Sequence, residues 1–162
     1  MTARTRLGPT AVVQVRPARL ADAEAICRIY NRAVVASTAT FDTEPRTVAE
    51  ERRRLKDPDF PILVAERRGR VVGWASLSPW SSRKAYARTA ETSVYVDAAS
   101  RGRGIGRRLL AQLLQIARHR GFRTLLARVS EESVPSLHLH ASLGFRPVGV
   151  MHEVGFKFGR WL

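Results

Sequence analysis

The chain has 162 residues, of which 44% are hydrophobic, and its 28 basic and 14 acidic side chains give a formal net charge of +14. This length and hydrophobic content suit one globular domain with its own core rather than two. The sequence contains no apolar run of about eighteen residues, so we expect no membrane-spanning helix. Its single cysteine, Cys27, excludes a disulfide within the chain and a cysteine metal site, and a reducing cytoplasm is the expected location.

The basic excess does not by itself identify a partner. Only Lys56, Lys84 and Lys157 are lysines, and the arginines occur in every segment rather than in one stripe. A nucleic-acid-binding module and a domain that binds a polyanionic cofactor both have such a charge. Charge alone therefore leaves these two interpretations open.

The first eleven residues are basic and polar and lack the apolar segment of a secretory signal, so we expect a flexible leader and then one domain over residues 12–162. In chain order, the first half is predicted to contain a strand at 12–16, helices at 21–35 and from Thr47 to before Pro58, and strands at 62–67 and 71–77. Thr47 and Glu50 have the spacing of a capping box, and a turn at 68–70 joins the last two strands. Cys27 lies within the apolar face of the first helix, which favours a buried thiol over a nucleophile.

The second half is predicted to contain a strand at 92–96, a helix at 104–120, a strand at 124–129, a helix at 136–143 and a strand from 145 onward. Gly121 and Gly144 are placed to end the two helices. Residues 79–88, before the first of these strands, are polar and irregular. Hairpins alternate with crossovers in this order, so the fold class is α/β with a mixed sheet.

A glycine-rich turn, Arg101-Gly102-Arg103-Gly104-Ile105-Gly106, lies between the fourth strand and the long helix. Backbone N–H groups at a helix start have no intrahelical acceptor, and the helix dipole and close approach to glycine favour a bound anion. Arg101, Arg103, Arg107 and Arg108 can add charge-assisted bonds. The turn lacks the Gly-Lys-Ser/Thr of a Walker-type loop, and it does not follow the first strand as a dinucleotide fingerprint does. The sequence therefore predicts a pyrophosphate site here.

This loop resembles the Gln/Arg-x-x-Gly-x-Gly/Ala signature of the GNAT acetyltransferases, which Arg101, Gly104 and Gly106 match. A closer resemblance, from about residue 15 to residue 162, is to the phosphinothricin (methionine sulfoximine/sulfone) N-acetyltransferase family. The matching segments are Thr38-Ala39-Thr40-Phe41, Pro79-Trp80 with Arg83, Ala85 and Tyr86, Thr89-Ala90-Glu91, Val94-Tyr95-Val96, Leu139-His140 with Leu143-Gly144-Phe145, and Val154-Gly155-Phe156-Lys157-Phe158-Gly159-Arg160-Trp161.

The resemblance implies the GNAT fold, in which a mostly antiparallel, twisted sheet splays apart between its fourth and fifth strands and carries helices on both faces. It implies an enzyme that uses acetyl-CoA, without a metal, to acetylate the α-amine of a small amino-acid-like substrate by direct transfer in a ternary complex. Antibiotic or herbicide detoxification by a homodimer is the matching expectation. Neither nucleic acid nor a membrane is an expected partner.

The resemblance also assigns cofactor-binding residues around the splay. Backbone groups of Val94 and Val96 would bond the pantetheine arm as an added strand does. The full set is Val94, Tyr95, Val96, Arg101, Gly102, Arg103, Gly104, Ile105, Gly106, Arg107, Ser133 and Ser136. Ser133 stands where the superfamily has asparagine, which removes the asparagine bond to the pantetheine arm while leaving a serine that can cap the last helix.

Two residues are candidates for the chemistry. Glu91, at the start of the fourth strand, stands where the family carries its base, and a carboxylate there takes the amine proton directly or through water. His140, four residues before Gly144, either protonates the departing CoA thiolate or helps to deprotonate the amine, and the sequence does not decide between these roles.

Four residues are candidates for substrate contact: Phe41, Arg83, Tyr86 and Arg88. Phe41 would wall the pocket, Arg83 and Tyr86 match the family, and Arg88 matches no fixed family residue. The arginines would pair with an anionic group of the substrate.

Two alternatives remain open. One is a GNAT enzyme that acts on a peptide N-terminus, a polyamine or an aminoglycoside, although Arg83 and Arg88 would repel the cationic acceptors. The other is a non-catalytic module that binds acyl-CoA or nucleic acid. The sequence also stops at Leu162, where the family continues with an acidic residue and a last strand, so we expect that strand to be missing or supplied from elsewhere.

Overall fold

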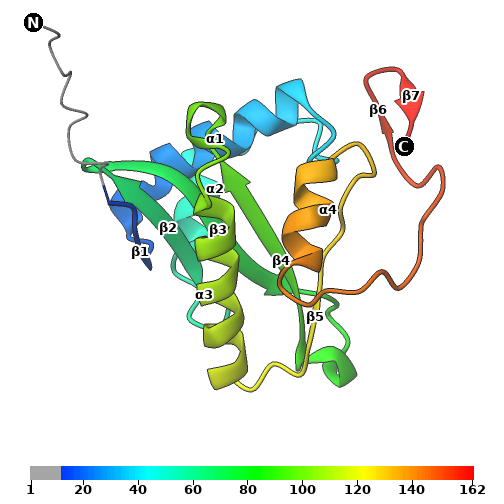
Figure 1. The fold of residues 1–162 in the computed structure, drawn as a ribbon. Coiled ribbons are helices and arrows are strands. Elements are labelled where there is room, and N and C mark those ends of the chain that lie inside the picture. Colours follow the sequence, from blue (N-terminus) through cyan, green and yellow to red (C-terminus); the bar gives the residue numbers. More distant parts are fainter. Residues whose placement is uncertain (1–11) are drawn as a thin grey trace, which may run out of the picture.

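A five-stranded sheet forms the centre of the computed structural model, which describes residues 12–162 (Figure 1). The expected leader at residues 1–11 lies outside the described residues. The strands, in their order across the sheet, are β1 (Gln14–Pro17), β2 (Ile62–Arg67), β3 (Arg70–Pro79), β4 (Thr89–Val96) and β5 (Thr124–Leu126). Neighbouring strands are antiparallel except β4 and β5, which are parallel, so the sheet is mixed as the sequence predicts.

Helices cover both faces of this sheet (Figure 1). They are α1 (Ala23–Ala36), α2 (Val48–Arg54), α3 (Ile105–His119) and α4 (Val134–Ala141), with single 3₁₀ turns at Leu20–Asp22, Lys84–Tyr86 and Ala98–Ser100. The apolar side of α3 packs on one face of the sheet, against residues such as Leu63 and Leu77. The apolar side of α1 packs on the opposite face, against residues such as Val64 and Trp74. Successive side chains of β2 and β3 point to opposite faces of the sheet, so each strand contributes to two separate cores.

Local signals explain why the first elements begin where they do. At α2 the Thr47 hydroxyl accepts a bond from the Glu50 N–H at 3.2 Å, and the Glu50 carboxylate accepts one from the Thr47 N–H at 2.8 Å. This reciprocal pair confirms the predicted capping box. Arg68 and Gly69 both have positive φ, as a tight hairpin turn between β2 and β3 requires.

Two predictions about the second half are wrong. The strand expected at 124–129 ends at Leu126, because β4 and β5 separate there and the later residues have no partner strand in the described part of the chain. Residues 145–155 form no strand at all, and the chain instead ends in a separate hairpin of β6 (Phe156–Lys157) and β7 (Arg160–Trp161). Pro147 lacks an N–H, and Gly149 and Gly155 weaken an extended run, which accounts for the interruption.

Candidate active site

The sheet opens between β4 and β5. Their parallel pairing stops at Glu91 and Leu126, while β4 continues to Val96. Just beyond the last pair, the Thr92 hydroxyl donates to the Leu126 carbonyl at 3.3 Å. Residues 93–96 then have β3 on one side and no strand on the other among the described residues. This free strand edge can pair with an extended ligand.

The glycine-rich turn lies at the end of this free edge, where α3 begins. The first bond of the helix runs from the Arg108 N–H to the Gly104 carbonyl at 3.1 Å, so the preceding N–H groups have no acceptor within the helix. Gly102 and Gly104 have φ values of +71° and +73°, and no atom lies within 4 Å of the space where a Cβ would stand on either residue. The turn is therefore an open backbone cradle of the kind that anions occupy.

The arginines around the cradle differ in what they contact. Arg101 Nε donates to the Val96 carbonyl at 3.1 Å, and Arg107 Nη1 donates to the Ser142 hydroxyl at 2.7 Å, which ties the start of α3 to the end of α4. Arg103 makes no side-chain hydrogen bond or ion pair with the described residues and is exposed. Ile105 is 2% exposed and belongs to the α3 core, so only its backbone remains for a ligand.

His140 lies on α4 with one ring nitrogen engaged and one free. Nδ1 lies 2.8 Å from the Ser136 carbonyl oxygen, one turn earlier, and 3.4 Å from the Ser136 hydroxyl. A bond to a carbonyl requires the proton on Nδ1, which leaves a lone pair on Nε2. Nε2 is buried and has no partner among the described residues, and the ring meets Phe145 edge-on at 5.0 Å. The imidazole is thus oriented, with one unused nitrogen.

Ser133 precedes α4 but does not cap it as the sequence analysis expects. Its side chain makes no capping bond, and its backbone angles, φ −89° and ψ 57°, depart from the extended conformation that directs a capping side chain. Its carbonyl accepts the N–H groups of Ser136 and Leu137 instead. Pro135, near the helix start, brings no N–H that needs a cap.

Glu91 lies on the face of β4 that α1 covers, in register with Ser78 of β3. Its side chain is 15% exposed, and Arg128 holds both of its carboxylate oxygens: Nε donates to Oε1 at 2.8 Å and Nη2 donates to Oε2 at 2.6 Å. These bonds raise the pKa of Arg128. The Arg128 guanidinium also lies 5.8 Å from the ring centre of Trp80.

The sequence alone predicts no role for Arg128. Its only signal in the sequence is its position near the end of the predicted strand at 124–129. The partnership with Glu91 spans 37 positions and depends on where the two strands part, which no local pattern reveals.

Tyr95 and Phe41 form part of the α1 side of the site. The Tyr95 ring stacks on Trp74 at 4.9 Å, and its hydroxyl donates to the Ala39 carbonyl at 3.1 Å, so this side chain holds the loop between α1 and α2. Burial raises the pKa of Tyr95. Phe41 is 44% exposed, and a Cβ on Gly155 would lie 2.4 Å from its ring, so the C-terminal segment passes directly over Phe41.

The remaining substrate candidates lie on the segment before β4. Arg83 and Tyr86 are exposed, and their side chains make no hydrogen bond or ion pair within residues 12–162. Arg88 is turned away from them, because its Nη1 donates to the Gly121 carbonyl at 3.2 Å, at the end of α3. The structure brings Glu91 together with Arg128 rather than with any of these three residues.

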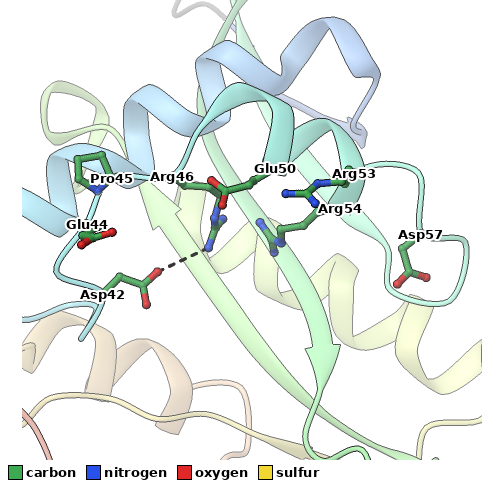
Figure 2. A pocket seen from close by; sticks show the side chains of 8 residues that line it. All are labelled: Asp42, Glu44, Pro45, Arg46, Glu50, Arg53, Arg54 and Asp57. Carbon is green, nitrogen blue, oxygen red and sulfur yellow. Dashed lines mark ion pairs between the residues drawn. The ribbon is translucent and has the colours of Figure 1, made fainter.

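An open cavity of about 560 Å³ lies under α2, over the same face of the sheet (Figure 2). Its floor includes Arg46 and Arg54, which both donate to the fully buried carboxylate of Glu51, at 3.0 and 2.8 Å. The lining residues are Asp42, Glu44, Pro45, Arg46, Glu50, Arg53, Arg54 and Asp57. None of the predicted site residues lines it.

Within residues 12–162, no group of three or more His, Cys, Asp or Glu side chains is arranged to hold a metal ion. No helix in this range is both long and apolar enough to span a bilayer.

Comparisons with known proteins agree with this geometry. A family model described as the Acetyltransferase (GNAT) family matches residues 24–145. The L-amino acid N-acyltransferase MnaT of Escherichia coli (strain K12) is 42% identical over 155 residues, which are 93% of this chain and 89% of that protein. The L-methionine sulfoximine/L-methionine sulfone acetyltransferase of Salmonella typhimurium is 42% identical over 153 residues, or 91% of this chain and 88% of that protein. The crystal structure of a GNAT superfamily phosphinothricin acetyltransferase from Sinorhizobium meliloti in complex with AcCoA has a TM-score of 0.88 and 36% identity, over 93% of this chain and 83% of that chain.

Proposed function

Because the chain belongs to the GNAT acetyltransferase family, we propose that it transfers the acetyl group of acetyl-CoA to the α-amine of a small amino-acid-like acceptor. The acceptors named for its relatives, methionine sulfoximine, methionine sulfone and phosphinothricin, define the proposed class. The observation that carries the proposal is the opening of the sheet after Glu91 and Leu126, beside the open backbone cradle at Gly102 and Gly104. The opening suits an extended thioester and the cradle suits a pyrophosphate.

The donor is proposed to bind along the free edge of β4. The pantetheine arm would pair with backbone groups of Val94 and Val96, and the pyrophosphate would accept N–H bonds from the glycine-rich turn. Arg103 supports this assignment, since it is an exposed arginine at the turn that no described side chain engages. Ser136 is engaged with His140, so Ser133, just before α4, is the more available of the two candidate serines.

The chemistry follows from what each group can do with a proton. The Glu91 carboxylate takes the first proton from the acceptor ammonium. The neutral nitrogen then attacks the thioester carbon, so that a C–N bond forms and the C–S bond breaks. The second nitrogen proton passes to the departing CoA thiolate. We assign His140 to this second transfer, because its Nε2 is buried, has no partner among the described residues and carries a lone pair when the neutral ring donates Nδ1–H to the Ser136 carbonyl.

We also propose that the protein forms a homodimer in the cytoplasm. The C-terminal segment exposes large apolar side chains, including Phe156, Phe158 and Trp161, which are 55–61% exposed. Apolar groups gathered in this way are typical of a protein interface. Cys27 is a buried free thiol, as is usual for proteins of a reducing compartment.

A thiol-release assay tests the proposed reaction. Acetyl-CoA is incubated with L-methionine sulfone, L-methionine sulfoximine, phosphinothricin, spermidine and an aminoglycoside, and free CoA is measured for each. The proposal predicts release with the amino-acid analogues and little with the two cations. Binding of acetyl-CoA without release for any acceptor would instead support a non-catalytic acyl-CoA-binding protein.

A further inference from the structure

We propose that Arg128 selects acceptors that carry an α-carboxylate, by exchanging Glu91 for that carboxylate when the acceptor binds. Arg128 donates to the two Glu91 carboxylate oxygens at 2.8 and 2.6 Å. This inference rests on the proposed acetyl transfer to amino-acid-like amines, and it assigns one residue to the recognition of that substrate class.

Arg128 lies at the place where β4 and β5 part. Glu91 and Leu126 form the last pair between β4 and β5, and Arg128 follows two residues later on the diverging chain. Its guanidinium reaches back to Glu91 and so bridges the mouth of the opening on the α1 face of the sheet. An amine that approaches a thioester in the opening from this face must pass the bridge.

The two partners of this ion pair are buried to different extents. The Arg128 side chain is 62% exposed, whereas that of Glu91 is 15% exposed. The remaining contact of Arg128 is with the Trp80 ring at 5.8 Å, and its Nη1 has no hydrogen-bond partner among the described residues, so this exposed guanidinium can face a ligand. By contrast, Arg46 and Arg54 serve the fully buried Glu51, and removing either would leave a buried carboxylate short of a partner.

The ion pair between Arg128 and Glu91 obstructs the proposed proton transfer to Glu91. While Arg128 donates to both carboxylate oxygens, Glu91 is not free to face an ammonium. An α-amino acid brings a carboxylate of the same shape and charge as Glu91, together with that ammonium. After the exchange, Arg128 holds the acceptor carboxylate and Glu91 faces the acceptor ammonium, so two ion pairs replace one. Ion pairs with an exposed partner are weak, so the first pair is readily given up.

Kinetics with two matched acceptors test the exchange. L-methionine sulfone and its α-carboxamide both carry the amine, and only the first carries the carboxylate. We expect Arg128→Ala to raise KM for methionine sulfone about 10- to 100-fold, as the loss of a charge-assisted contact does. The same variant should keep KM for the carboxamide within about twofold of the wild-type value. It should also raise kcat for the carboxamide, because Glu91 is then released from Arg128 although this acceptor has no carboxylate to replace it. Arg128→Lys should recover part of the affinity for methionine sulfone.

Controls separate the possible failures. Arg123→Ala removes an exposed arginine, just before β5, that makes no side-chain contact with the described residues, and it should behave like the wild type with both acceptors. If Arg128→Ala changes the KM of both acceptors equally, or changes neither KM, the proposed exchange is wrong even though the protein is an acetyltransferase. If the wild type releases CoA with neither acceptor, the proposed function itself falls, and this inference falls with it.

Discussion

Nδ1 of His140 lies 2.8 Å from the carbonyl oxygen of Ser136, while Nε2 of the same ring has no partner among the described residues. The helix thus fixes the tautomer of the ring, and packing against Phe145 fixes its plane. A buried nitrogen without a partner is costly unless a ligand or a proton uses it. This arrangement favours a role in proton transfer over a purely structural one.

Replacing His140 by phenylalanine keeps an aromatic ring beside Phe145 and removes both nitrogens. We expect kcat to fall at least tenfold, because groups that transfer protons contribute about 10²–10⁴-fold, while the Kd for acetyl-CoA stays unchanged. Steady-state kinetics and calorimetric titration measure the two quantities. His138→Phe is the matched control, since His138 is exposed on the same helix. Equal losses in both variants would show that the ring acts through the helix alone.

Replacing Gly104 by alanine tests the pyrophosphate cradle. At φ +73° an alanine costs about 1–2 kcal/mol of backbone strain, although no atom crowds its Cβ. If the loop relaxes, its N–H groups turn away from the phosphate, and KM for acetyl-CoA should rise about fivefold or more. Gly69→Ala carries the same strain at φ +71° in the hairpin between β2 and β3. That control should lower the melting temperature similarly and leave KM for acetyl-CoA unchanged, and a similar rise in both would refute a specific role for the cradle.

Lys157 anchors the C-terminal hairpin to the loop between α1 and α2. Its side chain is almost buried, and Nζ donates to the carbonyls of Ser37 and Thr40 at 3.0 and 2.7 Å. Burial lowers the pKa of this ammonium. Lys157→Met should cost about 1–3 kcal/mol in urea unfolding, because two carbonyls lose a charged donor. Lys56→Met, at an exposed lysine without a side-chain partner in the described chain, should stay within about 0.5 kcal/mol. Equal stability of the two variants would mean that the anchor contributes nothing.

Acid stability depends in part on Asp22. Arg16 donates to its two oxygens at 2.7 and 3.0 Å, and the backbone N–H of Arg19 adds a third bond, so these contacts lower the pKa of the carboxyl in the folded state. The unfolded chain then binds a proton at higher pH than the native one. The stabilisation is therefore complete above the unfolded pKa of about 3.9 and is lost as the pH falls through the lower folded value.

Asp22→Asn measures this contribution directly. We expect it to lower the free energy of unfolding by about 1–3 kcal/mol at pH 7, and the difference from wild type should shrink between pH 5 and pH 3. Asp59→Asn changes an exposed carboxyl that accepts no side-chain bond in the described chain, and it should show no such trend. A difference that stays constant over this pH range would rule out the ion pair as its source.

The sequence predicts those features of the structure that depend on neighbouring residues better than those that depend on distant ones. The strand at Ile62–Arg67 and the cap at Thr47 are predicted correctly, since each depends on neighbouring residues. The glycine-rich turn lies between the fourth strand and the long helix, as predicted, and Gly102 and Gly104 have positive φ there. The ion pair between Glu91 and Arg128 could not be predicted from the sequence, because it depends on the place where β4 and β5 separate.

The C-terminal region shows the opposite error. Residues 145–155 have apolar residues at the spacing of a strand, but a strand also needs a partner strand. Although Val154 and Gly155 form backbone bonds with Leu162, no strand pairs with this segment in the described chain. Ser133 was expected to cap α4 from its residue type, and its backbone angles prevent this. In both cases tertiary geometry overrides a local preference.

The most direct test of the account is the rate of CoA release by Glu91→Gln in a single turnover, with enzyme in excess over acetyl-CoA and L-methionine sulfone saturating. Glutamine keeps the shape of the side chain and removes the base. The account predicts a fall of about 10²-fold or more relative to the wild type, with unchanged affinity for acetyl-CoA. A Glu91→Gln enzyme that releases CoA at the wild-type rate would contradict it.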